Sequence, residues 1–265
     1  MKILITGYKG FIGQNMVNAL KDEHELTLFE WGDELPEFAG HDWCIHLGAI
    51  SSTTENDIHK ILIQNYDFSR YVINACNDNN VHLQYASSAS IYGRYLKFTE
   101  NSSPDPLSPY AWSKYLFERY VYGFKDKWHI RVQGFRYFNV HGPFEDHKGD
   151  QASPHHKFEK QAKETGVIKI FKGSASFLRD FVPVERVVDV HKKFFNIEES
   201  GVWNIGTGIA TSFETVAKRI AEKYNAKIEY IPMPLHISTQ YQKLTIANLE
   251  KLNKTLNENN GQRNI

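Results

Sequence analysis

The segment KILITGYKGFIG, residues 2–13, decides the fold of this chain. Residues 2–6 are mostly apolar and predict a buried strand, and residues 13–22 have the pattern of a helix behind it. Gly7, Gly10 and Gly13 stand between them as G-x-x-G-x-x-G. Glycine there permits a tight turn and lets main chain approach a pyrophosphate, while the helix N-terminus offers free N–H groups. The pattern therefore predicts a dinucleotide-binding loop.

Two further strand ends complete the predicted cofactor site. Glu30 ends an apolar run, where an acidic side chain usually receives the ribose hydroxyls. The strip HLGA, residues 46–49, ends another strand, and its small residues would leave room for the adenine half of the cofactor. An ordinary Gly-rich turn with a surface glutamate, or a close-packed turn, is the alternative interpretation. The predicted cofactor-binding residues are Gly7, Gly10, Phe11, Ile12, Gly13, Glu30, Leu47, Gly48, Ala49, Asn65, Tyr110 and Lys114.

Short apolar runs alternate with amphipathic stretches in the first half of the chain, which is typical of βαβ units and a parallel sheet. This alternation predicts an α/β fold with a doubly wound, Rossmann-type parallel sheet and a smaller α/β substrate lobe. The predicted strands are residues 2–6, 25–30, 43–48, 82–88 and 131–139, with helices near 64–79 and 109–124. We expect residues 1–139 and 179–208 in the dinucleotide-binding domain, residues 140–178 and 209–252 in the substrate lobe, and a disordered polar tail at 253–265.

Composition excludes several classes of protein. Lys plus Arg and Asp plus Glu both number 31, so the zero net charge gives no field that would hold nucleic acid or an anionic membrane. The apolar runs fall far short of the ~20 residues of a membrane helix, and the chain opens without a signal pattern, so we expect a cytoplasmic protein. Cys44 and Cys76 are expected to be buried thiols. The histidines lack ligand spacing, so we expect no metal.

The motif YAWSK, residues 110–114, is a Y-x-x-x-K on a predicted helix, so its phenol and ammonium lie one turn apart on the same face. A tyrosine with a pKa near ~10 is a poor base at neutral pH, but the Lys114 cation and a nicotinamide charge would favour the phenolate. Ser88, in YASSASIYG at a strand end, could bind the same substrate oxygen. Most Tyr–Lys pairs at this spacing lie on a protein surface and have no catalytic role. The dinucleotide loop and the serine-rich strand end favour a hydride-transfer site here.

With these motifs in place, the chain resembles the extended short-chain dehydrogenase/reductase family over nearly its full length. The motifs that carry the resemblance are GxxGxxG, SSxxxYG, YxxxK and FRYFNVHGP. Within the family, SSTTE at 51–55, HKGDQAS at 147–153, FLRDFV at 177–182, VWNIGTG at 202–208 and SFETVA at 212–217 resemble epimerases of an ADP-linked heptose. The resemblance implies that tightly bound NAD(P) transiently oxidises C6 of ADP-D-glycero-D-manno-heptose and re-reduces it on the opposite face.

The resemblance also implies roles for individual residues. Inversion needs an acid/base on each side of the sugar, which would be Tyr110 on one face and Lys148 of the HKG loop on the other. From the residues alone, Lys148 could equally be a solvated cation, and Arg179 could pair with Asp180 or Glu185. The predicted catalytic residues are Ser88, Tyr110, Lys114 and Lys148, and the predicted substrate contacts are Ser51, Ser52, Thr53, Ser88, Asn139, Lys148, Arg179 and Tyr241.

The choice between NAD and NADP stays open. The resemblance favours NADP, whereas Glu30 would repel a 2′-phosphate and the following WGDE offers no cation, which favours NAD. The stretch between Glu30 and Trp43 is shorter than in the family, which predicts the loss of one strand–helix unit. A 4-epimerase or a 4,6-dehydratase of the same fold is an alternative, as is a catalytically silent protein that senses NAD(P). We expect a nucleotide sugar as substrate, no nucleic-acid or membrane partner, and a homo-oligomer.

Overall fold

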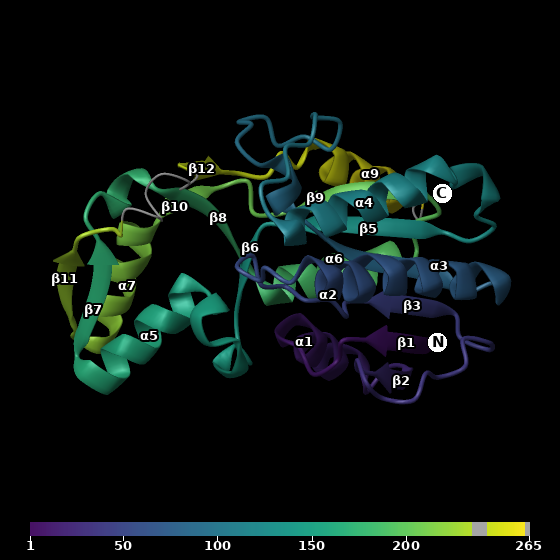
Figure 1. The fold of residues 1–265 in the computed structure, drawn as a ribbon, viewed down its shortest axis with the longest axis horizontal. Coiled ribbons are helices and arrows are strands. Elements are labelled where there is room, and N and C mark those ends of the chain that lie inside the picture. Colours follow the sequence, from purple (N-terminus) through teal and green to yellow (C-terminus); the bar gives the residue numbers. More distant parts are fainter. Residues whose placement is uncertain (235–242, 263–265) are drawn as a thin grey trace.

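The computed structural model describes residues 1–234 and 243–262, and its largest unit is a six-stranded parallel sheet (Figure 1). The strands follow the order β2-β1-β3-β4-β5-β9. Their bounds are β1 (Lys2–Thr6), β2 (Glu25–Phe29), β3 (Trp43–His46), β4 (His82–Ser88), β5 (Val132–Tyr137) and β9 (Gly201–Ile205). Every neighbouring pair is parallel, so the predicted doubly wound sheet is confirmed.

Helices cover both faces of this sheet, which explains why β3 and β5 are buried at every position. The helices of the large unit are α1 (Phe11–Leu20), α2 (Ile58–Ile61), the π-helical η1 (Leu62–Asp67), α3 (Phe68–Asp78), α4 (Pro109–Gly123) and α6 (Val184–Phe194), with short 3₁₀ helices η2 (Ala89–Tyr92) and η3 (Lys125–Lys127). In β1, Ile3 and Ile5 belong to the core that includes Met16 of α1. Leu4 points the other way and belongs to the core that includes Val72 of α3.

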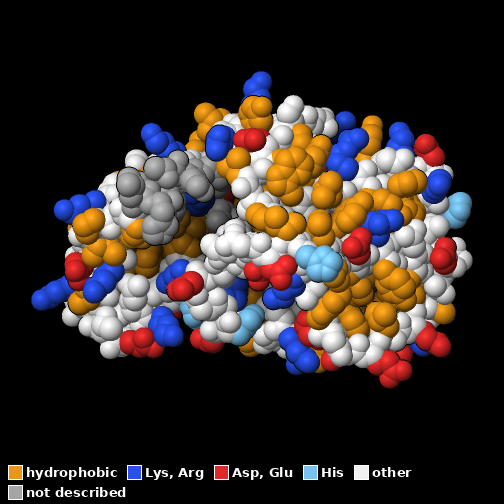
Figure 2. Space-filling view, viewed as in Figure 1, with side chains coloured by type: hydrophobic (Ala, Val, Ile, Leu, Met, Phe, Trp, Pro, Cys, Tyr) orange, Lys and Arg blue, Asp and Glu red, His pale blue; other side chains and the backbone are white. Residues whose placement is uncertain are grey.

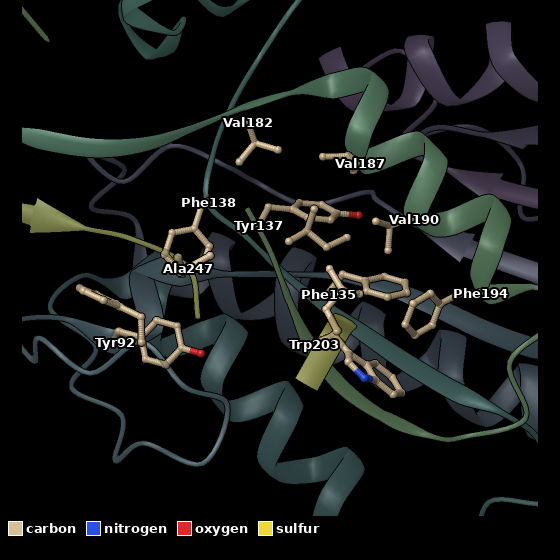
Figure 3. Packing of buried hydrophobic residues seen from close by; sticks show 14 of the residues in the cluster. Tyr92, Phe135, Tyr137, Phe138, Val182, Val187, Val190, Phe194, Trp203 and Ala247 are labelled. Atoms are coloured by element: carbon tan, nitrogen blue, oxygen red, sulfur yellow. The ribbon is translucent and has the colours of Figure 1, made fainter. Parts of the chain in front are cut away.

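The core beneath α6 is rich in aromatic side chains (Figure 3). Phe194 meets Phe135 of β5 and Trp203 of β9 edge to face, with ring centroids 5.0 and 4.8 Å apart. Such contacts add to the free energy gained by burying the rings. They fix α6 and β9 against β5, whose carboxyl end opens into the cleft described below.

Residues 30–42, between β2 and β3, contain neither a helix nor a strand. No strand–helix unit therefore stands between β2 and β3, as the short connection predicted. As a result, β2 is the edge strand of the sheet, where a further parallel strand usually follows in this kind of fold. The end of β2 nevertheless lies beside the glycine loop, because the Gly7 N–H donates to the Phe29 carbonyl at 2.8 Å.

A smaller unit lies to one side of the sheet (Figure 1). Its parallel pair β7 (Val167–Phe171) and β11 (Lys227–Ile231) packs with α5 (Pro154–Thr165) and α7 (Phe213–Tyr224). A third sheet of short strands joins the units, with the order β10 (Ala210–Ser212), β8 (Leu178–Pro183), β12 (Leu244–Thr245), and with β6 (Asn139–His141) also paired to β8. The smaller unit also contains the short 3₁₀ helices η4 (Asp146–Gln151) and η5 (Ser174–Ser176). Residues 179–183, expected in the large domain, therefore lie in β8 of this joining sheet instead.

The expectation of a disordered tail is wrong for residues 253–262, which belong to helix α9 (Glu250–Gln262). Leu252 is completely buried in the core that also contains Trp203. The Trp203 indole N–H donates to Thr255 Oγ1 at 3.1 Å, and Lys251 Nζ donates to the Val202 carbonyl at 3.0 Å. Composition missed this helix because a few side chains on one face dock it, while its other residues are polar. α9 also packs on the large unit, although residues up to 252 were expected in the substrate lobe.

Cys44 and Cys76 are both free and buried, as predicted. Across residues 1–234 and 243–262, none of the helices combines the length and the apolar character needed to cross a membrane.

Candidate active site

The glycine loop has room only for glycine at two of its three positions. A Cβ on Gly13 would lie 2.1 Å from the Gly7 carbonyl oxygen, and one on Gly7, where φ is +75°, would lie 2.5 Å from the Gly48 nitrogen. Helix α1 then begins at Phe11 with no capping side chain and no acidic residue in its first turn. Its N-terminal N–H groups and partial positive charge are thus free to bind an anion such as a pyrophosphate.

Glu30 lies beside this loop, at the end of β2. Its carboxylate accepts hydrogen bonds from the backbone N–H groups of Lys9 and Trp31, at 3.1 and 3.2 Å. Lys9 itself reaches Asp33, with Nζ 3.9 Å from the carboxylate. The negative side chain therefore faces the part of the site where a ribose would lie, and the nearest cation already has an acidic neighbour.

Asn65 does not contact the cleft, although it was predicted to bind the cofactor. The side chain is 0% exposed and sits in the π-helical turn η1. It accepts from Ile50 N at 2.8 Å and donates to Ile50 O at 2.9 Å and to Ser113 Oγ at 3.0 Å. Asn65 thus ties the segment after β3 to helix α4, and the prediction missed this because the partners are far apart in the sequence.

Helix α4 carries the Tyr–Lys pair. It begins where Ser108 Oγ accepts from Ala111 N at 3.2 Å and Pro109 occupies the first turn, a combination that favours a helix start. Tyr110 is partly exposed, whereas Lys114 is buried and its Nζ donates to the Ala86 carbonyl of β4 at 3.0 Å. The ammonium lies 6.0 Å from the centre of the Tyr110 ring. The predicted pairing of phenol and ammonium on one helix face is present.

The expected lowering of the Tyr110 pKa by Lys114 is not found. Burial raises the pKa of Tyr110, and a hydrogen bond with the Ser88 side chain partly opposes the rise. Burial also lowers the pKa of Lys114 to about 8, against the opposing effect of Glu118. The two shifts have one cause, because a buried site disfavours the charged form of either group. The protein's own groups therefore keep Tyr110 protonated at neutral pH.

Two adjoining cavities form a cleft at the carboxyl ends of the strands. The first, about 390 Å³, contains every predicted cofactor residue except Asn65; its lining is Gly7, Gly10, Phe11, Ile12, Gly13, Glu30, Leu47, Gly48, Ala49, Ile50, Ser51, Ser52, Ala86, Ser87, Tyr110, Lys114, Tyr137, His147, Lys148 and Gln151. The second, about 320 Å³, is lined by Phe11, Ile12, Ser51, Thr53, Ser87, Ser88, Tyr110, Tyr137, Phe138, Asn139, Val140, Lys148, Gln151, Ala152, Ser153 and Pro154. Tyr110 and Lys148 line both. The bare glycine edge and the adjacent Glu30 fit a dinucleotide in the first cavity.

Lys148 reaches the cleft from the 3₁₀ turn η4, which follows β6. Its Nζ lies 5.0 Å from the centre of the Phe11 ring and 3.9 Å from the Glu145 carboxylate. Burial lowers the pKa of Lys148, Glu145 raises it, and Lys157 lowers it. The side chain is only 21% exposed, so it is not the fully solvated cation that the sequence alone allowed.

The remaining predicted substrate residues differ in their placement. Ser51, Ser52, Thr53 and Asn139 line the cleft. Arg179, on β8, is 8% exposed and lines neither cavity; its Nη1 donates to the Leu178 carbonyl at 2.9 Å. Its neighbour Asp180 accepts from Thr207, Gly208 and Ala247. Tyr241 lies outside the described residues.

Several residues of the cleft were not singled out from the sequence. Tyr137 lines both cavities, and its hydroxyl lies 2.6 Å from His191 Nε2. Burial and the nearby Tyr110 raise the pKa of Tyr137, so it stays neutral. Gln151 lines both cavities and donates to Thr54 Oγ1 at 3.2 Å, which joins the HKG loop to the SSTTE loop. Tyr137 lies in the FRYFN motif and Gln151 in HKGDQAS, so the family motifs could have identified both as residues of the cleft.

The described residues hold no group of three or more His, Cys, Asp or Glu side chains arranged to bind a metal ion.

Residues 3–206 match the NAD dependent epimerase/dehydratase family, and the chain belongs to this family. It is 38% identical to the ADP-L-glycero-D-manno-heptose-6-epimerase of Brachyspira hyodysenteriae, over 94% of this chain and 90% of that one. Its identity to the enzyme of the same name from Alkalilimnicola ehrlichii is 34%, with the same coverage. The crystal structure of the Helicobacter pylori ADP-L-glycero-D-manno-heptose-6-epimerase has the same fold, with a TM-score of 0.86 at 24% identity over 97% of this chain and 90% of that chain. The resemblance inferred from the motifs is confirmed.

Proposed function

We propose that the chain is an NAD-dependent epimerase that inverts C6 of the heptose in ADP-D-glycero-D-manno-heptose. One observation carries the proposal: Tyr110 and Lys148, from separate elements, both line the two adjoining cavities beside the glycine loop. A dehydrogenase needs one proton-handling group at the reacting carbon, whereas an epimerase that works through a carbonyl needs one for each face. The names of the relatives at 34% and 38% identity support the same substrate.

Tyr110 and Lys148 each transfer one proton at the oxygen on C6 in this proposal. A bound nicotinamide ring would accept the C6 hydride and return it to the other face. The positive charge of an oxidised nicotinamide would lower the Tyr110 pKa and release its proton to solvent, so that Tyr110 Oη, as phenolate, takes the proton of the C6 hydroxyl. The Ser88 hydroxyl orients the same oxygen. Lys148 Nζ then donates a proton to the oxygen when the alcohol re-forms on the opposite face. The roles of Tyr110 and Lys148 exchange in the reverse reaction, because every step is reversible.

Two alternatives fit the cleft less well. A 4,6-dehydratase normally carries acidic residues after the catalytic serine, whereas here Ala89 and Ser90 follow Ser88, and η2 has no acidic residue in its first turn. A silent cofactor sensor would not need Ser88, Tyr110 and Lys148 around one cavity. We therefore favour the epimerase.

The proposed cofactor is NAD rather than NADP. The Glu30 carboxylate lines the first cavity, and the backbone N–H groups of Lys9 and Trp31 hold it in place. A carboxylate accepts hydrogen bonds from ribose hydroxyls, whereas it repels a 2′-phosphate. The only cation of the loop, Lys9, already has Asp33 as a neighbour at 3.9 Å, which weakens its attraction for a phosphate.

A third cavity, of about 400 Å³, is the proposed site for the nucleobase of the substrate. It lies in the smaller unit, and its apolar walls include Phe158, Phe171 and Phe213. Ser174 Oγ is buried at the edge of this cavity and has no hydrogen-bond partner among the described residues. Its hydroxyl could therefore form a hydrogen bond with a nucleobase. The Arg179 guanidinium lies 5.6 Å from the Phe213 ring centre, a position suited to a diphosphate between the base and the sugar.

We also propose that the protein is cytoplasmic and forms a homo-oligomer. The free thiols of Cys44 and Cys76 suit a reducing compartment. Tyr71 of α3 and Trp112 and Tyr122 of α4 are 48%, 48% and 61% exposed. In Figure 2, hydrophobic side chains gather over the half of the molecule where these two helices lie. Such exposed patches are common at protein interfaces. Light scattering of the purified chain tests the assembly, and a monomer at all concentrations would contradict it.

The substrate is tested by incubating the protein with ADP-D-glycero-D-manno-heptose and following the C6 configuration by NMR. Parallel samples receive NAD, NADP or neither, and a control sample receives UDP-glucose in place of the heptose. We expect an equilibrium mixture of C6 epimers, formed faster with NAD, and no change at C4 of UDP-glucose. Inversion at C4 without inversion at C6 would identify a different sugar epimerase, and no reaction with either sugar would contradict the proposal.

A further inference from the structure

Glu145 is a charged side chain with no exposed surface. It is 0% exposed and lies between the end of β6 and the turn η4. Oε1 accepts from Gly142 N at 3.1 Å and from Ser153 Oγ at 2.7 Å, and Oε2 accepts from Ser153 N at 2.6 Å. Every one of these neighbours is a donor, so both carboxylate oxygens accept hydrogen bonds from the surrounding chain.

These hydrogen bonds tie Glu145 to the residues that precede and follow the turn carrying Lys148. Gly142 precedes the turn and packs closely on α6, since a Cβ there would lie 2.5 Å from Val184 Cγ1. Ser153 follows the turn and caps helix α5, where its Oγ accepts from His156 N at 3.2 Å. One carboxylate therefore fixes both ends of the segment that carries Lys148.

The same carboxylate also acts on the Lys148 ammonium. Lys148 N donates to the Glu145 carbonyl at 2.9 Å, which folds the turn so that Nζ comes within 3.9 Å of Glu145 Oε2. On its other side the ammonium faces the Phe11 ring at the start of α1. Nζ thus sits between the dinucleotide loop and a buried negative charge.

We propose that Glu145 is a positioning residue of the reaction: it fixes the turn that carries Lys148 and keeps the Lys148 ammonium charged and aimed at the cleft. The inference rests on the proposed function of Lys148 as the second acid/base. Without the carboxylate, burial and the nearby Lys157 would favour the neutral amine, and Lys148 could not donate the proton to the re-formed alcohol.

The charges around Lys148 come from several elements. Glu145 raises the Lys148 pKa, whereas burial and Lys157 of α5 lower it. Lys157 Nζ is itself bound to the Asp150 carbonyl at 2.6 Å. The other titratable groups that line the first cavity with Lys148 are Glu30, Tyr110, Lys114 and His147. Glu145, with its carboxylate 3.9 Å from Nζ, therefore opposes these effects and favours the charged form of Lys148.

The first test follows the Lys148 ammonium directly, without substrate. Protein labelled with ¹³C at the lysine ε-carbons is titrated by NMR, and the Lys148 signal is assigned by its loss in Lys148→Met. We expect Glu145→Gln to lower the midpoint of this titration by about 1–3 pH units, the size of effect that a close opposite charge produces. Ser153→Ala is the matched control, because it weakens the same turn and leaves the carboxylate in place. An unchanged midpoint in Glu145→Gln, or an equal shift in Ser153→Ala, overturns the proposal.

The second test separates position from charge and covers the case in which Glu145→Gln does not fold. Glu145→Asp keeps the charge on a shorter side chain, so we expect a Lys148 midpoint close to that of the wild type but a kcat at least tenfold lower. A folded Asp variant with wild-type kcat would contradict the positioning role. Lys148→Met separates the proposed acid/base role of Lys148 from the proposed effect of Glu145 on its ammonium. If that variant still inverts C6, the proposed role of Lys148 fails, while the effect of Glu145 on the ammonium is still decided by the NMR titration.

Discussion

Replacing Tyr110 with phenylalanine separates the proton-handling step from the fold. The side chain is partly exposed in the cleft, and its hydroxyl interacts with Ser88. Ser88 Oγ still accepts from Ser90 N at 3.1 Å in the variant, so no buried polar atom loses its last partner. We therefore expect the free energy of unfolding to change by less than about 1 kcal/mol.

The expected effect on turnover is much larger. A positioned acid/base contributes about 10²–10⁴ in rate, which corresponds to ~2.7–5.4 kcal/mol of activation free energy. We expect the kcat of Tyr110→Phe to fall at least a hundredfold, measured as the NMR rate of C6 inversion. The affinity for NAD, measured by quenching of tryptophan fluorescence, should change by less than about threefold, because the glycine loop and Glu30 are untouched.

Tyr92→Phe is the matched control. Tyr92 is completely buried outside the cleft, where its hydroxyl donates to Asn204 Oδ1 at 2.7 Å and accepts from Arg136 Nη1 at 2.9 Å. Its loss leaves buried polar groups short of a partner, which costs about 1–3 kcal/mol of stability. We expect this variant to melt several degrees lower and to keep its turnover. If Tyr110→Phe retained turnover within tenfold of the wild type, the assignment of Tyr110 would be refuted.

Lys148→Met should stop inversion while nicotinamide absorbance still reports partial reduction of the cofactor; normal inversion would exclude the two-sided scheme. Glu30→Ala should move the ratio of NAD to NADP affinity toward NADP by about tenfold or more, because hydrogen bonds to a charged group contribute about 1.5–3 kcal/mol; equal ratios in titrations of both proteins would contradict this. Leu252→Ala should cost about 2–5 kcal/mol in urea unfolding, with the exposed Lys254→Ala as an unaffected control, because Leu252 fills the core. Burial lowers the pKa of Lys114 from 10.5 to about 8, so the unfolded chain binds an extra proton between these values, and this group's contribution to stability rises with pH across that window. The stability advantage of Lys114→Met over the wild type should therefore shrink from pH 8 to 10.5, and a constant advantage would argue against the shift.

The parts that the sequence predicted well are those whose partners lie close together along the chain. The glycine loop occupies a strand end and the following helix start, and the Tyr110–Lys114 pair occupies one turn of one helix. Local spacing determines their geometry, so a pattern is enough to predict it. The parallel sheet followed from the same kind of information, because short apolar runs that alternate with amphipathic helical stretches are typical of βαβ units.

The parts that the sequence did not predict depend on contacts between distant segments. Asn65 resembles any polar residue on a helix until the fold brings Ile50 and Ser113 to its side chain. Helix α9 is polar over most of its length, and only docking on β9 makes its burial of Leu252 apparent. Glu145 was not singled out either, because its burial depends on how β6, η4 and α5 meet.

In the proposed reaction, C6 is inverted by removing a hydride and returning the same hydride to the opposite face. The most direct measurement uses ADP-D-glycero-D-manno-heptose carrying deuterium at C6, incubated in ordinary water and analysed by NMR of the epimer formed. We predict that the deuterium remains at C6 of the product, because the hydride would stay on a cofactor held in the cleft. Replacement of the deuterium by solvent hydrogen would mean that C6 loses a proton instead, and it would contradict the account.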